Sequence, residues 1–312
     1  MNVFLWHVHG SWTTAFVQGS HRYFVPVVPG RGPEGRGRAD TYEWPANVIE
    51  VTGAEARELP VDIVVLQRRE ELDGWAERWL GGRRPGRDVP AIYLEHNAPQ
   101  GRINEMRHPA ADRPDLTVVH VTHFNDLFWE CGQTPTRVIE HGIVDPGARY
   151  SGELPRAAVV VNEPVRRRRV TGTDLLPRFE AAVPVDLFGM QVTSLGGFEN
   201  LPQWRMHQEI ARRRVYVHPM RWTSLGLSLL EAMQLGMPVV SLATTEAVEA
   251  VPPEAGVIST QVDVLVEAVR RLVCAPEEAH RMGARAREYA LARYGLERFL
   301  NDWDRVLGEV AR

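Results

Sequence analysis

The chain has 312 residues, of which 44% are apolar, with a formal net charge of −4 and a pI near 6.3. These values are ordinary for a folded protein of about two domains, and they argue against extended disorder. The small excess of acidic residues also argues against nucleic-acid binding, which depends on neutralising phosphates with positive charge.

The cysteines and the N-terminal segment indicate a cytoplasmic protein. Cys131 and Cys274 lie far apart and form no Cys-x-x-Cys or Cys/His spacing, which is typical of a reducing compartment and predicts neither disulfides nor a zinc site. Residues 1–7 lack a basic leader, and no run approaches 18 apolar residues.

The first half of the chain alternates short apolar runs with helical or loop segments. A helix is expected to start just after the turn at Gly10, and further helices are predicted for residues 70–80 and 124–131. The predicted strands cover residues 3–8, 23–28, 61–67, 91–94, 116–121 and 137–140.

Two polar segments of this half follow predicted strands. Gly10 and Ser11 form a pair at which a ligand could approach the backbone closely, although a simple tight turn explains them equally well. His96 follows the strand 91–94, at the strand end where open α/β sheets place binding residues. A structural histidine would fit that position equally well.

The segment 29–38 contains the spacing Gly-x-Gly-x-x-Gly at Gly30, Gly32 and Gly35. A dinucleotide site requires the last glycine to open a helix, whereas here Pro33 and more Gly and Arg residues interrupt the pattern. We interpret the segment as a mobile basic loop, either a cover for an acceptor or simply a solvated connection.

After a break at residues 141–147, the second half repeats the alternation of strands and helices. Two such series predict an α/β protein with two Rossmann-like, doubly wound parallel sheets facing a cleft. We place the domains at 1–145 and 146–294, with a final helix, 295–312, packing back on the first. The predicted strands of this half are 157–161, 185–188, 214–218, 239–242 and 256–259, and the predicted helices are 173–182, 202–212, 224–236, 262–273, 276–293 and 296–310.

The helix predicted for 224–236 carries one carboxylate, Glu231, among mostly apolar residues. Ser224 is a suitable N-cap, and Gly236 followed by Pro238 ends the helix. A lone helical glutamate usually faces solvent. Because this helix joins two predicted parallel strands, its N-terminal end should open at the ligand-binding edge of the sheet.

Two charged runs have contrasting positions. The arginines of 166–169 follow the first strand of the second half, where guanidinium groups could hold a diphosphate, although arginine runs are usually solvated. The run Asp302-Trp303-Asp304 resembles the acidic triplet of metal-dependent transferases, but it falls within the last amphipathic helix. We expect surface carboxylates there and no metal.

On these residues the chain resembles the retaining glycosyltransferases of the two-Rossmann GT-B architecture, of the family 4 type. The resemblance covers nearly the whole chain and is densest in the second half. The matching segments are 138–145 (VIEHGIVD), 186–189 (DLFG), 216–219 (YVHP), 229–233 (LLEAM) and 236–240 (GMPVV).

The resemblance implies transfer of a sugar from a nucleotide-diphosphate donor, bound by the second domain, to an acceptor hydroxyl on the side of the first. Glu231 would bind the ribose hydroxyls, and backbone amides of 225–227 would meet the donor sugar. No cofactor, metal or nucleic-acid partner is expected, and no basic amphipathic helix supports membrane association. The implied catalytic residues are His96, Arg166 and Arg169, and the implied donor-binding residues are Gly10, Ser11, Asn162, Gly189, Arg221, Thr223, Ser224, Leu225, Gly226, Leu227 and Glu231.

Two departures from the family pattern affect these expectations. A second glutamate usually stands eight positions before the first and contacts the sugar, whereas this chain has Thr223, with Arg221 and Trp222 ahead of it. The Arg and Lys that usually hold the diphosphate are also missing, so one of Arg166 to Arg169 would replace them. A sugar-nucleotide binding protein without activity and a nucleotide-sugar epimerase are the alternatives.

Overall fold

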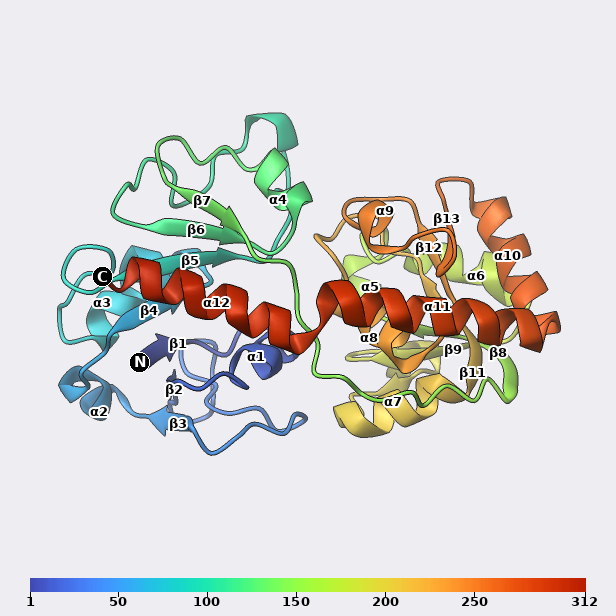
Figure 1. The fold of residues 1–312 in the computed structure, drawn as a ribbon, viewed down its shortest axis with the longest axis horizontal. Helices are drawn as coiled ribbons and strands as arrows, with labels where there is room; N and C mark the ends of the chain where they lie inside the picture. Colours follow the sequence, from blue (N-terminus) through green and yellow to red (C-terminus); the bar gives the residue numbers. More distant parts are fainter. The chain divides into compact units, whose positions relative to one another are not determined.

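The computed structural model describes residues 1–312, which divide into two compact units. Unit 1 comprises residues 1–142 and 296–312, and unit 2 comprises residues 143–295 (Figure 1). Each unit contains one parallel β-sheet with helices packed against it, so the predicted class of two parallel-sheet α/β domains is confirmed.

Unit 1 has a seven-stranded sheet in the order β3-β2-β1-β4-β5-β6-β7, with every pair parallel. The order changes direction between β1 and β4, which is the kind of position where doubly wound sheets bind ligands. The strands are β1 (Asn2–Leu5), β2 (Arg22–Pro26), β3 (Val48–Val51), β4 (Ile63–Leu66), β5 (Ala91–Glu95), β6 (Thr117–His120) and β7 (Thr136–Val138). The helices are α1 (Gly10–Phe16), α2 (Gly53–Glu58), η1 (Glu71–Trp75), α3 (Ala76–Trp79), η2 (Ile103–Glu105), α4 (His123–Phe128) and α12 (Leu296–Val310).

Three local expectations for unit 1 were wrong or incomplete. Strand β3 and helix α2 were not predicted, although Thr52 and Glu55 form a capping box at the start of α2. The helix predicted for 70–80 is a π-helix followed by a short α-helix, because Gly74 with φ 144° interrupts the regular backbone.

The segment 29–38 is held in place rather than loose. Its backbone pairs with neighbouring residues, since Val28 N donates to the Gly35 oxygen at 2.9 Å and Gly37 N to the Pro26 oxygen at 2.8 Å. Trp6 Nε1 also donates to the Glu34 oxygen at 3.0 Å. The expectation of a mobile loop overlooked these anchors, which come from residues elsewhere in unit 1.

Helix α12 completes the core of unit 1. The rings of Trp303 lie 5.6 Å from Trp12 and 5.0 Å from Phe16, measured between centroids, and all three side chains are buried. Phe299 lies close to Gly142, where an added Cβ would meet the Phe299 Cβ at 2.3 Å. The last 17 residues therefore pack against helix α1 near the start of the chain (Figure 1).

Unit 2 has a six-stranded sheet in the order β10-β9-β8-β11-β12-β13, again with every pair parallel. The strands are β8 (Leu154–Val160), β9 (Val185–Gly189), β10 (Phe198–Glu199), β11 (Arg213–His218), β12 (Val239–Leu242) and β13 (Gly256–Ser259). The helices are α5 (Pro164–Arg167), η3 (Thr173–Leu175), α6 (Leu176–Glu180), η4 (Thr193–Leu195), α7 (Gln203–Arg212), α8 (Leu227–Leu235), α9 (Ala247–Ala250), α10 (Val262–Cys274) and α11 (Pro276–Tyr294).

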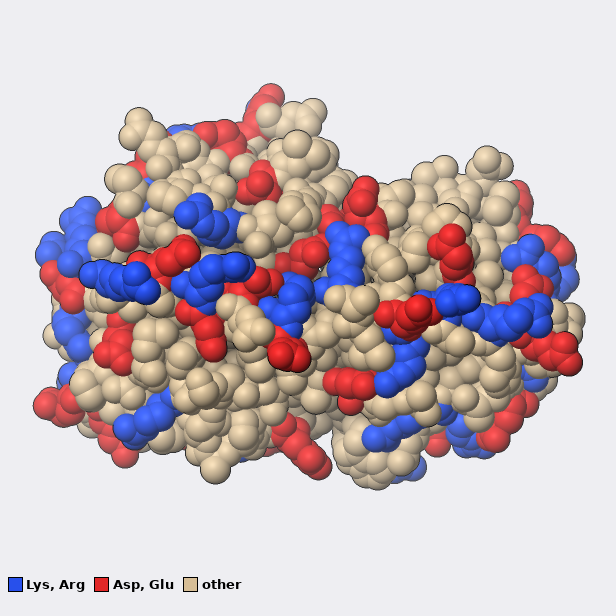
Figure 2. All heavy atoms as spheres, viewed as in Figure 1, with Lys and Arg blue, Asp and Glu red and all other residues tan.

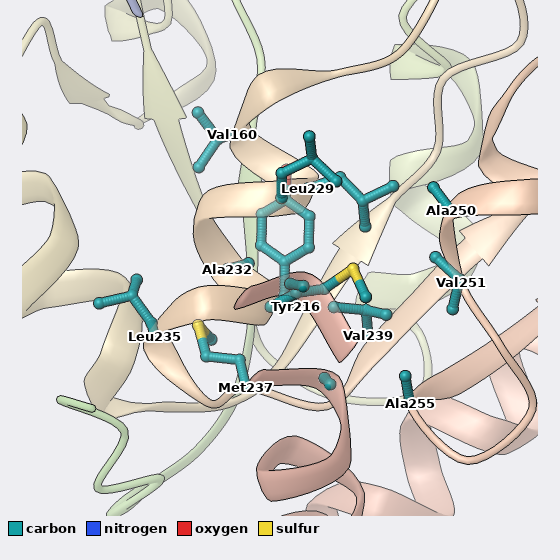
Figure 3. Packing of buried hydrophobic residues seen from close by; sticks show 14 of the residues in the cluster. Val160, Tyr216, Leu229, Ala232, Leu235, Met237, Val239, Ala250, Val251 and Ala255 are labelled. Carbon is teal, nitrogen blue, oxygen red and sulfur yellow. The ribbon is translucent and has the colours of Figure 1, made fainter. Parts of the chain in front are cut away.

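Helix α8 lies in the apolar core of unit 2 (Figure 3). Its residues Leu229 and Ala232 pack with Tyr216 of β11 and Val239 of β12, and all four are fully buried. Burying each large apolar side chain of this kind contributes roughly 1.5–3 kcal/mol. Helix α8 is thereby fixed against the strands that precede and follow it.

The ends of α8 agree only in part with the sequence prediction. Gly236 takes the predicted left-handed conformation, with φ 92°. The helix begins at Leu227 with Gly226 as its N-cap, so the prediction of a Ser224 cap was wrong. Residues 224–226 instead form a loop, in which the Ser224 carbonyl accepts a bond from Glu246 N at 3.4 Å.

Two surface properties complete the description. On the face shown in Figure 2, positive and negative side chains are interspersed in small groups. None of the helices has the combination of length and apolar character needed to cross a lipid bilayer.

Candidate functional site

The carboxyl ends of the unit 2 strands are joined into one framework by hydrogen bonds. The loops after β8 and β9 are linked because Met190 N donates to Asn162 Oδ1 at 2.9 Å and Glu163 N to the Met190 oxygen at 2.8 Å. The loop after β11 joins them because Arg221 N donates to the Val170 oxygen at 2.9 Å. Parallel strands therefore present several predicted site residues at one edge.

Gly189 sits within this framework at the end of β9, where only glycine fits. Its φ is 137°, and an added Cβ would lie 2.0 Å from the Val161 carbonyl oxygen. The backbones of β8 and β9 thus approach each other closely at the ligand-binding edge of the sheet.

Glu231 of α8 is buried, with 3% of its surface exposed. Its Oε1 accepts a bond from Gln203 Nε2 at 3.1 Å, and its Oε2 lies 3.3 Å from His207 Nε2, without hydrogen-bond alignment. Both partners come from α7, where their four-residue spacing puts them on one face. The carboxylate is therefore held beneath the surface and does not face bulk solvent.

The residues before α8 form a tight loop against His218. Ser224 and Leu225 are buried, and Thr223 is half-buried beside them. An added Cβ on Gly226 would lie 2.3 Å from His218 Cε1, so a larger residue there requires the imidazole or the loop to move. The first amides of α8, including that of Leu227, have no side-chain cap.

The structure separates the four arginines of 166–169 into two kinds. Arg166 makes a two-pronged pair with Glu163, with one contact at 2.9 Å, and Arg169 contacts Asp174 at 3.2 Å. Both side chains are largely exposed. The other two, Arg167 and Arg168, form no ion pair with a carboxylate, although the charge of Glu163 acts on Arg167.

Arg167 and Arg168 border a cavity of about 570 Å³ that is also lined by Arg169, Val170 and Asp174. Burial lowers the pKa of Arg167 below its usual value, which reflects the cost of placing this charge away from water. Arg168 has φ 35° and ψ −101°, a backbone conformation that is rare for a residue with a side chain. Such strain is concentrated at functional sites in many proteins.

Arg221 reaches the same region from the loop after β11. Its two terminal nitrogens both contact Asp174, one at 2.8 Å, and its Nη1 also donates to the Arg169 oxygen at 2.8 Å. The neighbouring guanidinium groups hold the pKa of Asp174 below its usual value, first through the Arg221 hydrogen bonds. Asp174 is thus an ionised carboxylate shared by two arginines.

Unit 1 holds the other predicted site residues. Helix α1 begins at Gly10, followed by Ser11, and an added Cβ on Gly10 would lie 2.5 Å from Tyr42 Cε2. His96 is buried, its Nε2 is 2.8 Å from Gln67 Oε1, and its ring lies 4.1 Å from that of His9. Burial lowers the pKa of His96 well below its usual value, so its imidazole is neutral at pH 7.

In unit 2 the loop after β8, with Asn162 and the arginines, is bonded to Met190, which follows Gly189, and to Arg221. The structure places Gly10, Ser11 and His96 in unit 1. Sequence reasoning missed Gln203, His207 and Asp174. The four-residue spacing of Gln203 and His207 on one predicted helix was the available signal, but nothing in the sequence showed which element that face contacts.

The acidic run near the C-terminus belongs to helix α12. Asp302 pairs with Arg298 at 3.0 Å, and Asp304 pairs with His21 at 3.0 Å. Trp303 between them is buried. No group of three or more His, Cys, Asp or Glu side chains is arranged to hold a metal ion.

Comparison with known proteins shows which family the second half of the chain resembles. Residues 198–289 match the family model described as "Glycosyl transferases group 1", and this range includes Arg221 and Glu231. This segment of the chain is similar to the group 1 glycosyltransferases. None of the curated proteins is similar to the sequence.

Solved structures share the fold of this chain. Sucrose-phosphate synthase from Thermosynechococcus elongatus matches with a TM-score of 0.72 at 14% identity, covering 99% of this chain and 98% of that chain. Anabaena Alr3699/HepE in complex with UDP-glucose matches with a TM-score of 0.66 at 14% identity, covering 99% of this chain and 100% of that chain. A mutant of S. aureus TarM, with a TM-score of 0.61 and 14% identity, matches over 78% of this chain, which spans only 55% of that chain. These likenesses confirm the GT-B fold.

Proposed function

We propose that the protein transfers a sugar from a nucleotide-diphosphate sugar to an acceptor hydroxyl, with retention and without a metal ion. The observation that carries the proposal is the buried Glu231, whose two carboxylate oxygens meet Gln203 and His207 of α7 inside the segment that matches the family model. HepE, which shares the fold, has been solved with UDP and with UDP-glucose. A uridine nucleotide is therefore the first donor to test.

In this proposal Glu231 accepts hydrogen bonds from the two ribose hydroxyls. Gln203 and His207 fix the carboxylate before the donor arrives, which reduces the ordering needed on binding. The uncapped amides at the start of α8 face the sugar hydroxyls, and Gly226 allows this loop to lie against His218.

Breaking the bond between the sugar and the diphosphate requires stabilisation of the negative charge that develops on the leaving phosphate. Arg167 and Arg168 suit this role, since neither forms an ion pair with a carboxylate and both border the cavity. Arg166 and Arg169 were the catalytic candidates from the sequence, but they are paired with Glu163 and Asp174 respectively. They are therefore weaker candidates for this role than Arg167 and Arg168. The neutral His96 would face the transferred sugar.

The nucleotide site is tested by replacing Glu231 with Ala and measuring the dissociation constant of UDP by calorimetry. Losing two hydrogen bonds to a carboxylate should weaken binding by about 100-fold, at roughly 1.5 kcal/mol for each bond. Glu267→Ala, on an exposed face of α10, is the matched control and should bind as the wild type does. An unchanged constant in Glu231→Ala would remove the ribose role.

The arginine assignment is tested separately with four single alanine variants at 166, 167, 168 and 169. Arg167→Ala and Arg168→Ala should lose about 100-fold or more in turnover, because each removes a charge aimed at the leaving group. Arg166→Ala should lose little, since its charge is already paired. Equal turnover in all four variants contradicts the assignment.

Thr223, in place of the glutamate expected by resemblance, favours a second candidate: a protein that binds sugar nucleotides without turning them over. The two functions are distinguished by incubating the protein with a radiolabelled donor and a panel of acceptors. Tight donor binding with no product and no slow hydrolysis would support the second candidate. Release of free UDP supports transfer, and conversion to a new sugar nucleotide would indicate epimerisation.

A further inference from the structure

The cavity beside the arginine segment has more positive charge than a diphosphate needs. It is lined by Arg167, Arg168 and Arg169, and Arg221 joins them through its contacts with Asp174. Asp174 is the only acidic residue lining the cavity. Four guanidinium groups therefore meet one carboxylate.

These charges fall into two groups. Arg167 and Arg168 form no ion pair with a carboxylate and together match the two negative charges of a nucleotide-linked diphosphate. Arg169 and Arg221 share the single charge of Asp174, which leaves one positive charge unmatched. Arg169 is largely exposed and its charge is solvated, whereas the Arg221 side chain is 26% exposed, so Arg221 is the arginine that a second anion would pair with.

The geometry of Arg221 shows that it has donors left for such an anion. Its contacts, two to Asp174 and one to the Arg169 oxygen, use three of its five N–H groups. The Arg221 side chain is 26% exposed and its backbone N–H donates to the Val170 oxygen, so the residue is fixed at the edge of the cavity. A planar guanidinium held in this way, with two N–H donors left, suits a second carboxylate better than a hydroxyl.

We propose, resting on the donor site described above, that the donor sugar is a hexuronate and that Arg221, supported by Arg169, binds its carboxylate. A donor sugar is bonded directly to the terminal phosphate, so a group that recognises the sugar lies beside the groups that hold the diphosphate. Asp174 then acts as a positioning residue that orients both arginines toward the sugar.

Two ligands that differ only at the sugar C6 test the proposal on the full-length protein. The dissociation constants of UDP-glucuronate and UDP-glucose are measured by calorimetry, with UDP alone as reference. A charge-assisted pair with a guanidinium predicts that UDP-glucuronate binds about 10-fold or more tightly than UDP-glucose. The preference should shrink as salt concentration rises.

Two variants show whether Arg221 is responsible. In Arg221→Gln the ratio of the two constants should fall towards one, and Arg169→Gln should lower it partially. Arg270→Gln, an arginine of the same unit paired with Glu267 on the surface of α10, should retain the wild-type ratio. Thermal unfolding of each variant identifies any that fail to fold, and the comparison of ligands on the wild type requires no variant.

The outcomes separate this inference from the proposed function. If UDP and UDP-glucose bind but UDP-glucuronate binds no tighter than UDP-glucose, the inference of a hexuronate donor is wrong and the proposed donor site is retained. A preference that survives in Arg221→Gln overturns the role of Arg221. If none of UDP, GDP, ADP and dTDP binds, the proposed function itself fails.

Discussion

At the scale of single residues, the contacts of Glu231 matter more than its burial. Gln203 holds Oε1 and His207 lies beside Oε2, so the carboxylate reaches a ligand already oriented. A carboxylate in this position without those neighbours would pay a desolvation cost and lose its fixed orientation. The two side chains of α7 are therefore expected to act on nucleotide affinity without touching the nucleotide.

Replacing His207 with Ala should weaken UDP binding about 3- to 10-fold, which corresponds to a loss of roughly 0.5–1.5 kcal/mol. His207→Gln should recover part of the loss, since its amide N–H can donate to Oε2. Calorimetry measures both, and Arg205→Ala on the exposed face of α7 is the control. Equal affinity in His207→Ala and the wild type would show that His207 does not help to position Glu231.

The sequence singled out Glu231 as a candidate donor-binding residue because it is one carboxylate in a mostly apolar helix. It did not predict Gln203 and His207, which lie 28 and 24 positions earlier and meet Glu231 only through the packing of α7 on α8. The same limit applies to Asp174, whose two arginine partners come from separate loops. Pairings across elements depend on tertiary packing that residue spacing does not encode.

At the scale of elements, α12 shows what a strongly amphipathic pattern can predict. Its bounds, Leu296–Val310, agree with the range read from the sequence. Short elements were not predictable in this way: β10 has two residues, and β3 has four with a mixed burial pattern. Such edge strands depend on the neighbouring strand for their pairing, and hydrophobic periodicity needs a longer run.

Trp303→Ala should destabilise unit 1 by about 3–5 kcal/mol, because it removes a fully buried indole from a cluster of aromatic rings. Urea unfolding followed by tryptophan fluorescence measures the loss. Leu127→Ala, on α4 of the same unit with 79% exposure, should change stability by less than about 0.5 kcal/mol. Similar losses in the two variants would mean that α12 contributes no specific packing.

At the scale of the whole molecule, several buried histidines make the fold sensitive to acid. Burial lowers the pKa of His120 and His218 to about 4 and that of His141 to about 3. Unfolding returns each to its ordinary value of 6.5, so the unfolded chain binds more protons below that pH. Their contribution to stability is present above about pH 6.5 and is lost progressively towards about pH 4.

One buried acid opposes this trend. Burial raises the pKa of Glu71 to about 7, so its protonation below pH 7 favours the folded state. Three histidines outweigh one carboxyl group, because each pKa unit corresponds to about 1.4 kcal/mol and the shifts are of similar size. The urea midpoint should therefore fall between pH 7 and pH 5, and a constant or rising midpoint would contradict this balance.

The alternation of strands and helices was enough to predict two parallel sheets, since parallel strands need long crossovers and their buried runs are short and apolar. The strand order was not predicted. The position of β1 between β2 and β4, or of β8 between β9 and β11, depends on whether each crossover connection places the next strand on one side of the preceding strand or on the other. That choice is made by the packing of helices on each sheet face.

Unit 2 has one more property that follows from how its two ends meet. Ile143 and Gly295 form a β-bridge, and Ile143 N donates to the Tyr294 oxygen at 3.1 Å. The polypeptide therefore leaves the body of unit 2 next to the place where it entered. A gene fragment encoding only 143–295 keeps every strand of that sheet and adds no dangling loop. Such an excised module is a natural starting material for nuclear magnetic resonance mapping of nucleotides, free of signals from the remainder of the chain.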